Sequence, residues 1–169
     1  MNIKRIAKHL LMTHWQVNRT FPRDMLAAID RAIKASEIAH DGEIRFAVEG
    51  ALDGAALLKG QSGKARALEV FSQLRVWDTQ HNNGLLIYLL LADRHVEIVA
   101  DRGIHEKVGT AEWEGICRKM EMAFKQANYE GGVVIGIQAV TQLLAKHFPA
   151  AASGRNELPD KPVLLQRNQ

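Results

Sequence analysis

The sequence predicts an α/β fold: a three-layer α/β/α sandwich with a small mixed sheet that contains a β-hairpin and has helices on both faces. Residues 85–91 are apolar at odd and even positions alike, which is typical of a strand covered on both faces. A polar break at Asp93-Arg94 and an alternating run at 96–101 follow, which indicates a hairpin. Helical periodicity precedes and follows these strands, as layered α/β domains require.

Residues 1–20 are predicted to form a basic amphipathic helix. Apolar side chains recur at Ile3, Ile6 and Leu10, and all charged residues before Asp24 are basic. Such a helix can lie on an anionic membrane, so peripheral membrane contact through residues 1–19 is one expectation. The alternative is that the helix packs on the domain or on a second copy of it, which would make a homo-oligomer.

Residues 21–149 are predicted to form the sandwich. Pro22 suits the start of a helix, and 43–49 alternates as a strand should. A helix–strand order of this kind makes 43–49 parallel to 85–91, because strand–helix–strand links are normally right-handed parallel crossovers. Ser62 is expected to cap the intervening helix. Two further helices follow the hairpin; Pro149 ends the last, and the tail 150–169 is expected to be extended or mobile.

Composition places limits on function. The chain has 169 residues, 47% of them hydrophobic, which suits one domain with a substantial core. A net charge of +3 without a basic face beyond the N-terminal segment argues against a nucleic-acid partner. The single cysteine, Cys117, cannot form an internal disulfide and is predicted to be a small core residue. No secretory signal is visible, so a cytoplasmic location is expected.

Polar residues gather at the open end of the predicted hairpin, where 82–84 lies beside 101–103. Hard cations prefer carboxylate, amide and backbone oxygens, and glycine lets the backbone approach closely. Parallel pairing would bring the start of strand 43–49 to the same end. The alternative is ordinary turn chemistry with solvated charges. The candidate cation ligands are Asn82, Asn83, Asp101, Glu43 and Glu106.

The opposite end of the sheet offers a second candidate site. In open α/β sheets, ligands prefer the carboxyl ends of parallel strands, which meet at this end. The alternative is a charged hairpin tip without a ligand. The candidate residues are Glu49, Asp53, Asp93 and His95.

From residue 24 to residue 148 the chain resembles the TPM domain family, which includes thylakoid-lumen proteins and a photosystem II repair protein. The resemblance rests on an ordered series. A helix containing Phe71 leads to Asn83-Gly84 and a Leu-rich strand; Asp93-Arg94 makes a turn; a second turn stands at Gly103-Ile104; and Tyr129-Glu130-Gly131-Gly132 opens the last helix. No single motif is specific to the family, but the motifs in this order are more specific than any one of them.

The resemblance implies binding of a divalent cation, usually Ca²⁺, and weak acid phosphatase activity, with Asp101 as the candidate catalytic base or phosphate-site carboxylate. Two departures stand out: family members usually have aspartate where this chain has Asn82, and often glycine where it has Asp101. Members are commonly exported and often carry a membrane helix. This chain shows neither signal, so a short, divergent, cytoplasmic bacterial member is expected.

Three functions follow as hypotheses. The first is a cation-binding TPM-like domain with marginal phosphatase activity. The alternative is a non-catalytic interaction or modulator domain, acting on an unknown protein partner or at a membrane surface. The third is a structural, self-associating protein.

Overall fold

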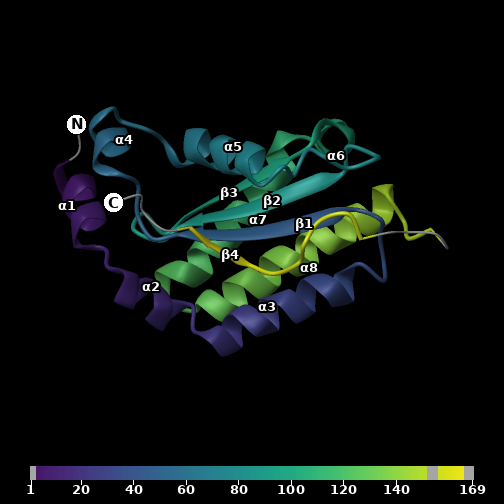
Figure 1. Cartoon of the computed structure of the whole chain (residues 1–169). Coiled ribbons are helices and arrows are strands. Elements are labelled where there is room, and N and C mark those ends of the chain that lie inside the picture. The colour runs from purple at the N-terminus through teal and green to yellow at the C-terminus, as the bar shows by residue number, and fades with distance from the viewer. Residues whose placement is uncertain (1–2, 152–155, 166–169) are drawn as a thin grey trace.

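A four-stranded mixed sheet separates two layers of helices in the computed structural model, which describes residues 3–151 and 156–165 (Figure 1). The strand order is β3-β2-β1-β4. β1 runs parallel to β2 and to β4, while β2 and β3 form the antiparallel hairpin. The strands are β1 (Glu43–Glu49), β2 (Gly84–Leu90), β3 (His95–Ala100) and β4 (Val163–Leu165). The predicted α/β sandwich with a mixed sheet is therefore confirmed.

Eight helices are present among the described residues. Helix α5 lies over one face of the sheet, α3, α7 and α8 lie over the other, and α4 lies beside α1 (Figure 1). The helices are α1 (Ile3–Leu11), α2 (His14–Thr20), α3 (Arg23–Ser36), α4 (Gly54–Leu58), α5 (Gly63–Gln73), α6 (Arg102–Val108), α7 (Thr110–Lys125) and α8 (Tyr129–His147). Ser62 caps α5, as predicted: its hydroxyl accepts from the backbone N–H of Ala65 at 3.1 Å.

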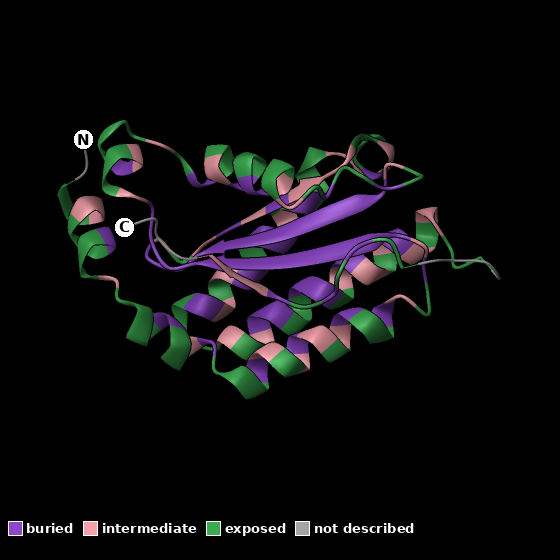
Figure 2. Cartoon of the chain, in the orientation of Figure 1, coloured by how far each residue is buried: buried purple, intermediate pink, exposed green. Residues whose placement is uncertain are grey.

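The two faces of the sheet have separate apolar cores. Odd-numbered residues of β2, such as Leu85 and Ile87, join the core beneath α3, α7 and α8. Even-numbered residues, such as Leu86 and Tyr88, join the core beneath α5. Every residue of β2 is buried, which confirms that this strand is covered on both faces (Figure 2).

The N-terminal segment is two helices, which corrects the prediction of one helix over residues 1–20. The break falls at Met12-Thr13. Thr13 forms a capping box with Gln16: its hydroxyl accepts from the Gln16 N–H at 3.3 Å, and the Gln16 side chain accepts from the Thr13 N–H at 2.8 Å. These two bonds start a new helix at His14, so α2 takes a direction of its own.

The C-terminal tail contributes a strand that sequence analysis did not anticipate. β4 pairs with β1 at the edge of the sheet, with Ala47 opposite Val163. Residues 152–155 and 166–169 of the predicted tail lie outside the described residues. A second unexpected element is α6, which begins where the sequence predicted only a turn, because the Asp101 side chain caps it.

Truncating a buried side chain of β2 should be costly. We expect Leu89→Ala, at a residue with 0% exposure, to lower the free energy of unfolding by about 2–5 kcal/mol, since a cavity would remain inside the core. Urea titration measures this loss. Leu68→Ala, on the exposed side of α5, is the control and should change stability by less than about 0.5 kcal/mol. Equal losses in both variants would contradict the buried placement of Leu89.

Candidate functional site at the open end of the hairpin

At the open end of the hairpin, backbone segments that are separate in sequence approach one another very closely. The backbone N–H of Asp101 donates to the Gly84 carbonyl at 2.9 Å, which places 82–84 beside 101–103, as predicted. A Cβ atom at Gly84 would lie 1.9 Å from the Val76 carbonyl oxygen, and one at Gly103 would lie 2.6 Å from that of His81. Only glycine fits at these two positions, so their role is close backbone approach.

Asn82, Asp101 and Arg102 form a connected polar group at this end. The Arg102 Nε donates to Asn82 Oδ1 at 3.1 Å, and Asp101 Oδ1 accepts from the Arg102 N–H at 2.7 Å. Asn82 has φ of +51°, a left-handed conformation that asparagine and aspartate tolerate better than most residues. The side-chain oxygen of Asn82 and one carboxylate oxygen of Asp101 therefore already accept hydrogen bonds.

Two buried oxygens at this end of the hairpin have no hydrogen-bond partner among the described residues: Asn83 Oδ1 and Asp101 Oδ2. Asn83 is completely buried, and its amide is fixed because Nδ2 donates to the Asp41 carbonyl at 2.9 Å. Its own N–H donates to the Thr79 hydroxyl at 3.1 Å. Buried acceptors are normally satisfied, so each of these two oxygens is open to a further donor or ligand.

The other two predicted ligands are placed differently. Glu43 lies at the same end, opposite Gly84, but its carboxylate accepts from the N–H groups of Glu157 and Leu158 at 2.9 and 3.1 Å. Burial nevertheless raises the pKa of Glu43. Glu106 is exposed on α6. The structure therefore brings Asn82, Asn83 and Asp101 together and uses Glu43 to hold the tail.

The four residues of the second candidate site are not brought together: Glu49, Asp93 and His95 each belong to a separate polar group, and Asp53 belongs to none of the three. Buried Glu49 accepts from Arg66 Nε and Nη2 at 2.8 and 3.0 Å, and from the Tyr88 hydroxyl. Burial raises the pKa of the Tyr88 hydroxyl, which therefore stays protonated. The bond to Glu49 raises the pKa of the Arg66 guanidinium, which therefore stays charged. Asp53 precedes α4 without a side-chain capping bond.

Asp93 holds the N-terminal helix. It lies 2.9 Å from Arg5 Nε and 3.1 Å from His9 Nε2, both on α1. Burial would raise the pKa of Asp93, but the bonds from His9 and Arg5 outweigh it and the pKa is lowered. The carboxyl ends of the parallel strands, where the sequence suggested a ligand, are thus covered in part by α1.

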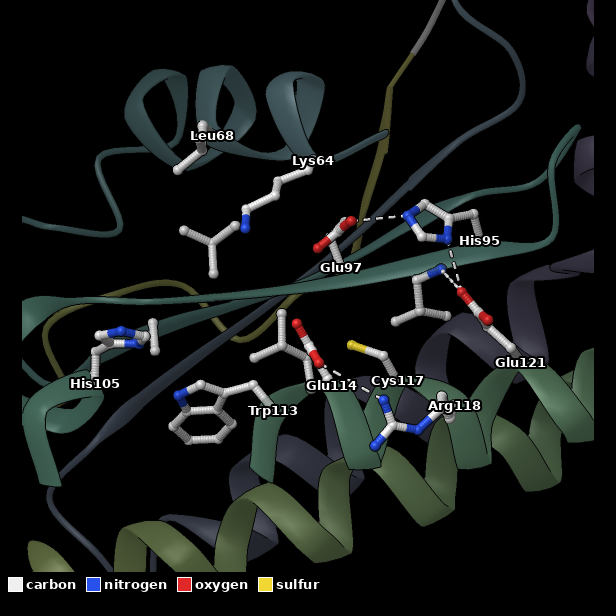
Figure 3. A pocket seen from close by; sticks show the side chains of 14 residues that line it. Lys64, Leu68, His95, Glu97, His105, Trp113, Glu114, Cys117, Arg118 and Glu121 are labelled. Carbon is white, nitrogen blue, oxygen red and sulfur yellow. Dashed lines mark hydrogen bonds and ion pairs between the residues drawn. The ribbon is translucent and has the colours of Figure 1, made fainter. Parts of the chain in front are cut away.

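His95 lines a groove of about 430 Å³ along the edge strand β3, between α5 and α7 (Figure 3). Its Nδ1 is 2.7 Å from Glu121 Oε1 on α7, and its Nε2 is 2.8 Å from Glu97 Oε1. The same Glu121 oxygen accepts from the Val96 N–H at 3.1 Å. Two carboxylates therefore clamp one imidazole and attach α7 to the sheet edge.

The described residues contain neither a cluster of metal-ligating side chains nor an activated thiol. No group of three His, Cys, Asp or Glu side chains suited to a metal occurs in residues 3–151 and 156–165. Cys117 belongs to the core, as predicted, and burial raises the pKa of its thiol to about 12, which suppresses the thiolate. No helix in the described part of the chain is long and apolar enough to cross a membrane.

Several residues that shape these sites were not singled out from the sequence. Arg5 and His9 are four apart and share one side of α1, a spacing that was visible, but their partner Asp93 lies far along the chain. Thr79 and Arg66 gave no sequence signal, because their roles depend on how the loop before β2 and α5 pack on the sheet.

Comparison with known proteins identifies relatives of this architecture. The sequence model of the TPM domain family matches residues 18–143. The NMR structure of the BA42 protein from the psychrophilic bacterium Bizionia argentinensis is similar, with 31% identity, a TM-score of 0.73, and coverage of 83% of this chain and 92% of that one. The N-terminal domain of a P. gingivalis protein shares the fold at 21% identity, with a TM-score of 0.59, and coverage of 76% and 81%. No curated protein sequence matches the chain.

The His95 clamp should make stability depend on pH. The bond to Glu97 raises the pKa of His95 above 6.5; burial opposes this, and Glu121 reinforces it. Stabilisation by the imidazolium should be fully present below about pH 6.5 and lost as pH rises through the folded-state pKa. Because the side chain is 38% exposed, solvent screening limits the effect to about 1 kcal/mol.

Urea titration of His95→Asn and the parent protein measures the effect. The two should differ most below about pH 6.5 and converge as pH rises through the raised folded-state pKa of His95. His105→Asn, which alters an exposed histidine of the same groove, is the control and should show no such pH dependence. A His95→Asn difference that stays constant with pH would mean that the ion pairs do not stabilise the fold.

Proposed function

Because this chain belongs to the TPM domain family, we propose that it binds a divalent cation, Ca²⁺, weakly at the open end of the hairpin, with phosphatase activity at most marginal. The observation that carries the proposal is the pair of buried oxygens without partners, Asn83 Oδ1 and Asp101 Oδ2. They belong to neighbouring strand ends, since Asp101 pairs with the residue that follows Asn83. Both are hard oxygen donors of the type that Ca²⁺ prefers.

Weak binding is expected because the site has little negative charge. Asp101 is its only carboxylate ligand, since both Glu43 oxygens accept backbone N–H groups and Glu106 stands exposed on α6. The guanidinium of Arg102 lies beside Asn82 and would repel a cation. Sites of low charge bind Ca²⁺ with dissociation constants of about 10⁻⁴–10⁻³ M.

Phosphatase activity would use the same residues. A bound cation would polarise a phosphate oxygen, as metal ions do in phosphoryl transfer. Asp101 would act as the phosphate-site carboxylate by holding the cation through Oδ2, the oxygen that does not cap α6; without a cation, the same oxygen would be the candidate base. Arg102, exposed at the same end, supplies a positive charge for a phosphate group. One carboxylate and one arginine on a weakly held cation support only a marginal rate.

A second candidate function is a non-catalytic interaction or modulator domain. It is favoured by the large apolar side chains that α1 and α2 leave exposed, which include Leu11 and Trp15. Such a face can bind a protein partner, a second copy of the chain or a membrane surface. The cytoplasmic location expected from the sequence remains a prediction.

Calorimetric titration with Ca²⁺ tests the proposed site. We expect the parent protein to bind with a dissociation constant of about 10⁻⁴–10⁻³ M and Asp101→Asn to bind more weakly. Asparagine keeps the ability to cap α6, so this variant removes charge without removing the cap. Arg102→Gln should strengthen binding by removing the repulsion. Asn82→Asp restores the family's usual acid and should strengthen binding most when combined with Arg102→Gln.

Asp53→Asn, at the other end of the sheet, is the matched control and should bind Ca²⁺ as the parent does. Equal affinity in the parent, Asn82→Asp and Asp101→Asn would remove the open end from consideration. Hydrolysis of p-nitrophenyl phosphate at acid pH, with and without Ca²⁺, measures the second part of the proposal. Activity that survives in Asp101→Asn would exclude Asp101 from the reaction.

A further inference from the structure

Helix α1 contacts the domain through polar side chains. The Arg5 Nη1 donates to the Gln61 carbonyl at 3.0 Å, and its Nε is 2.9 Å from Asp93. His9 is fully buried, and its Nδ1 accepts from the Leu52 N–H at 3.1 Å. An amphipathic helix on a soluble domain normally buries its apolar side. Here Arg5 and His9 face inward, and the apolar Ile3, Leu10 and Leu11 stay exposed together with Lys4 and Lys8.

The outward side of α1 and α2 carries large apolar residues. Ile3, Leu10, Leu11 and Trp15 have between 62% and 76% of their surface exposed. Figure 2 shows α1 and α2 largely exposed, in contrast to the buried strands β1 and β2. Such a group of exposed apolar side chains on adjacent elements is typical of an interaction surface.

Cations accompany these apolar side chains. Lys8, Arg19 and Arg94 line a hollow of about 640 Å³ together with Leu11 and Trp15. The Arg19 guanidinium lies 5.2 Å from the centre of the Trp15 ring. Residues 3–23 contain no acid, and the one acid of the hollow, Asp93, is paired with Arg5 and His9. We call this surface the N-terminal face: it consists of Lys8, Leu11, Trp15, Arg19 and Arg94 around the hollow, with Ile3 and Leu10 exposed on an adjoining side of α1.

We propose that the N-terminal face docks on the surface of an anionic phospholipid bilayer. Leucine side chains enter the acyl boundary, tryptophan lies at the level of the headgroups, and the cations contact lipid phosphates. A second copy is the poorer fit: a two-fold pairing of this face with itself would set Lys8, Arg19 and Arg94 against like charges. The inference deepens the second candidate function and does not depend on cation binding at the hairpin.

Co-sedimentation of the full chain with vesicles tests the proposal. We expect binding to vesicles of phosphatidylcholine mixed with phosphatidylglycerol, little binding to phosphatidylcholine alone, and release at high salt. EDTA is present throughout, so a failure of Ca²⁺ binding leaves the result unaffected. Leu10→Ser/Leu11→Ser should abolish binding. Lys8→Gln/Arg19→Gln should weaken it by about fivefold for each cation removed.

Matched controls change exposed residues elsewhere. Leu68→Ser/Met122→Ser and Lys119→Gln/Lys125→Gln should bind vesicles as the parent does. Circular dichroism verifies that each variant is folded, and Trp15→Ser serves if the double leucine variant is not. The proposal is overturned if the parent fails to bind anionic vesicles, or if Leu10→Ser/Leu11→Ser binds them fully. A dimer in sedimentation velocity that this variant abolishes, without vesicle binding, would instead assign the face to a second copy.

Discussion

Burial of β1 on both faces is the constraint on which the rest of this structure depends. All seven residues of the strand are buried, although Glu43, Arg45 and Glu49 are charged. An unpaired buried charge costs about 3–5 kcal/mol, a large part of the stability of a small domain. Each of these side chains therefore needs a partner, and each partner comes from a segment distant in sequence.

The partners of Glu43, Arg45 and Glu49 explain why the C-terminal tail and α5 lie along β1. The tail gives backbone N–H groups to Glu43 and the Lys161 carbonyl to Arg45, whose Nη1 is 3.4 Å away. Helix α5 gives Arg66 to Glu49. Because the tail follows the polar side of β1, it is well placed to continue into β4 and pair with the strand. Charge compensation and strand pairing thus reinforce one another.

The need to pair buried polar groups is met differently at the two ends of the sheet. At the carboxyl ends of the parallel strands, Glu49 and Asp93 are neutralised by α5 and α1, and little remains for a ligand. At the open end of the hairpin, Asn83 and Asp101 each keep an oxygen without a partner in residues 3–151 and 156–165. Oxygens without a partner among the described residues are therefore found at the hairpin opening, whereas large exposed apolar side chains are found on α1 and α2.

The sequence by itself determined the elements whose cause is local. Apolar residues on both sides of 85–91 determine a strand with two covered faces, the turn at Asp93-Arg94 determines the hairpin, and the hairpin places Asn82, Asn83 and Asp101 together. Alternation in 43–49 predicted a strand but not that its polar side is buried, because the tail that covers it lies more than a hundred residues away.

Only the tertiary structure decided the orientation of α1 and the state of each site residue. The periodicity of α1 shows that it has an apolar and a polar side, but not which side meets the domain, since Asp93 and Leu52 select Arg5 and His9 over the leucines. For the same reason, sequence could name Glu43 and Asp101 as equal candidates, whereas in the described part of the chain both Glu43 oxygens accept backbone N–H groups and Asp101 keeps one oxygen without a partner. Composition and spacing determine which groups are near one another; long-range hydrogen bonds determine which remain available.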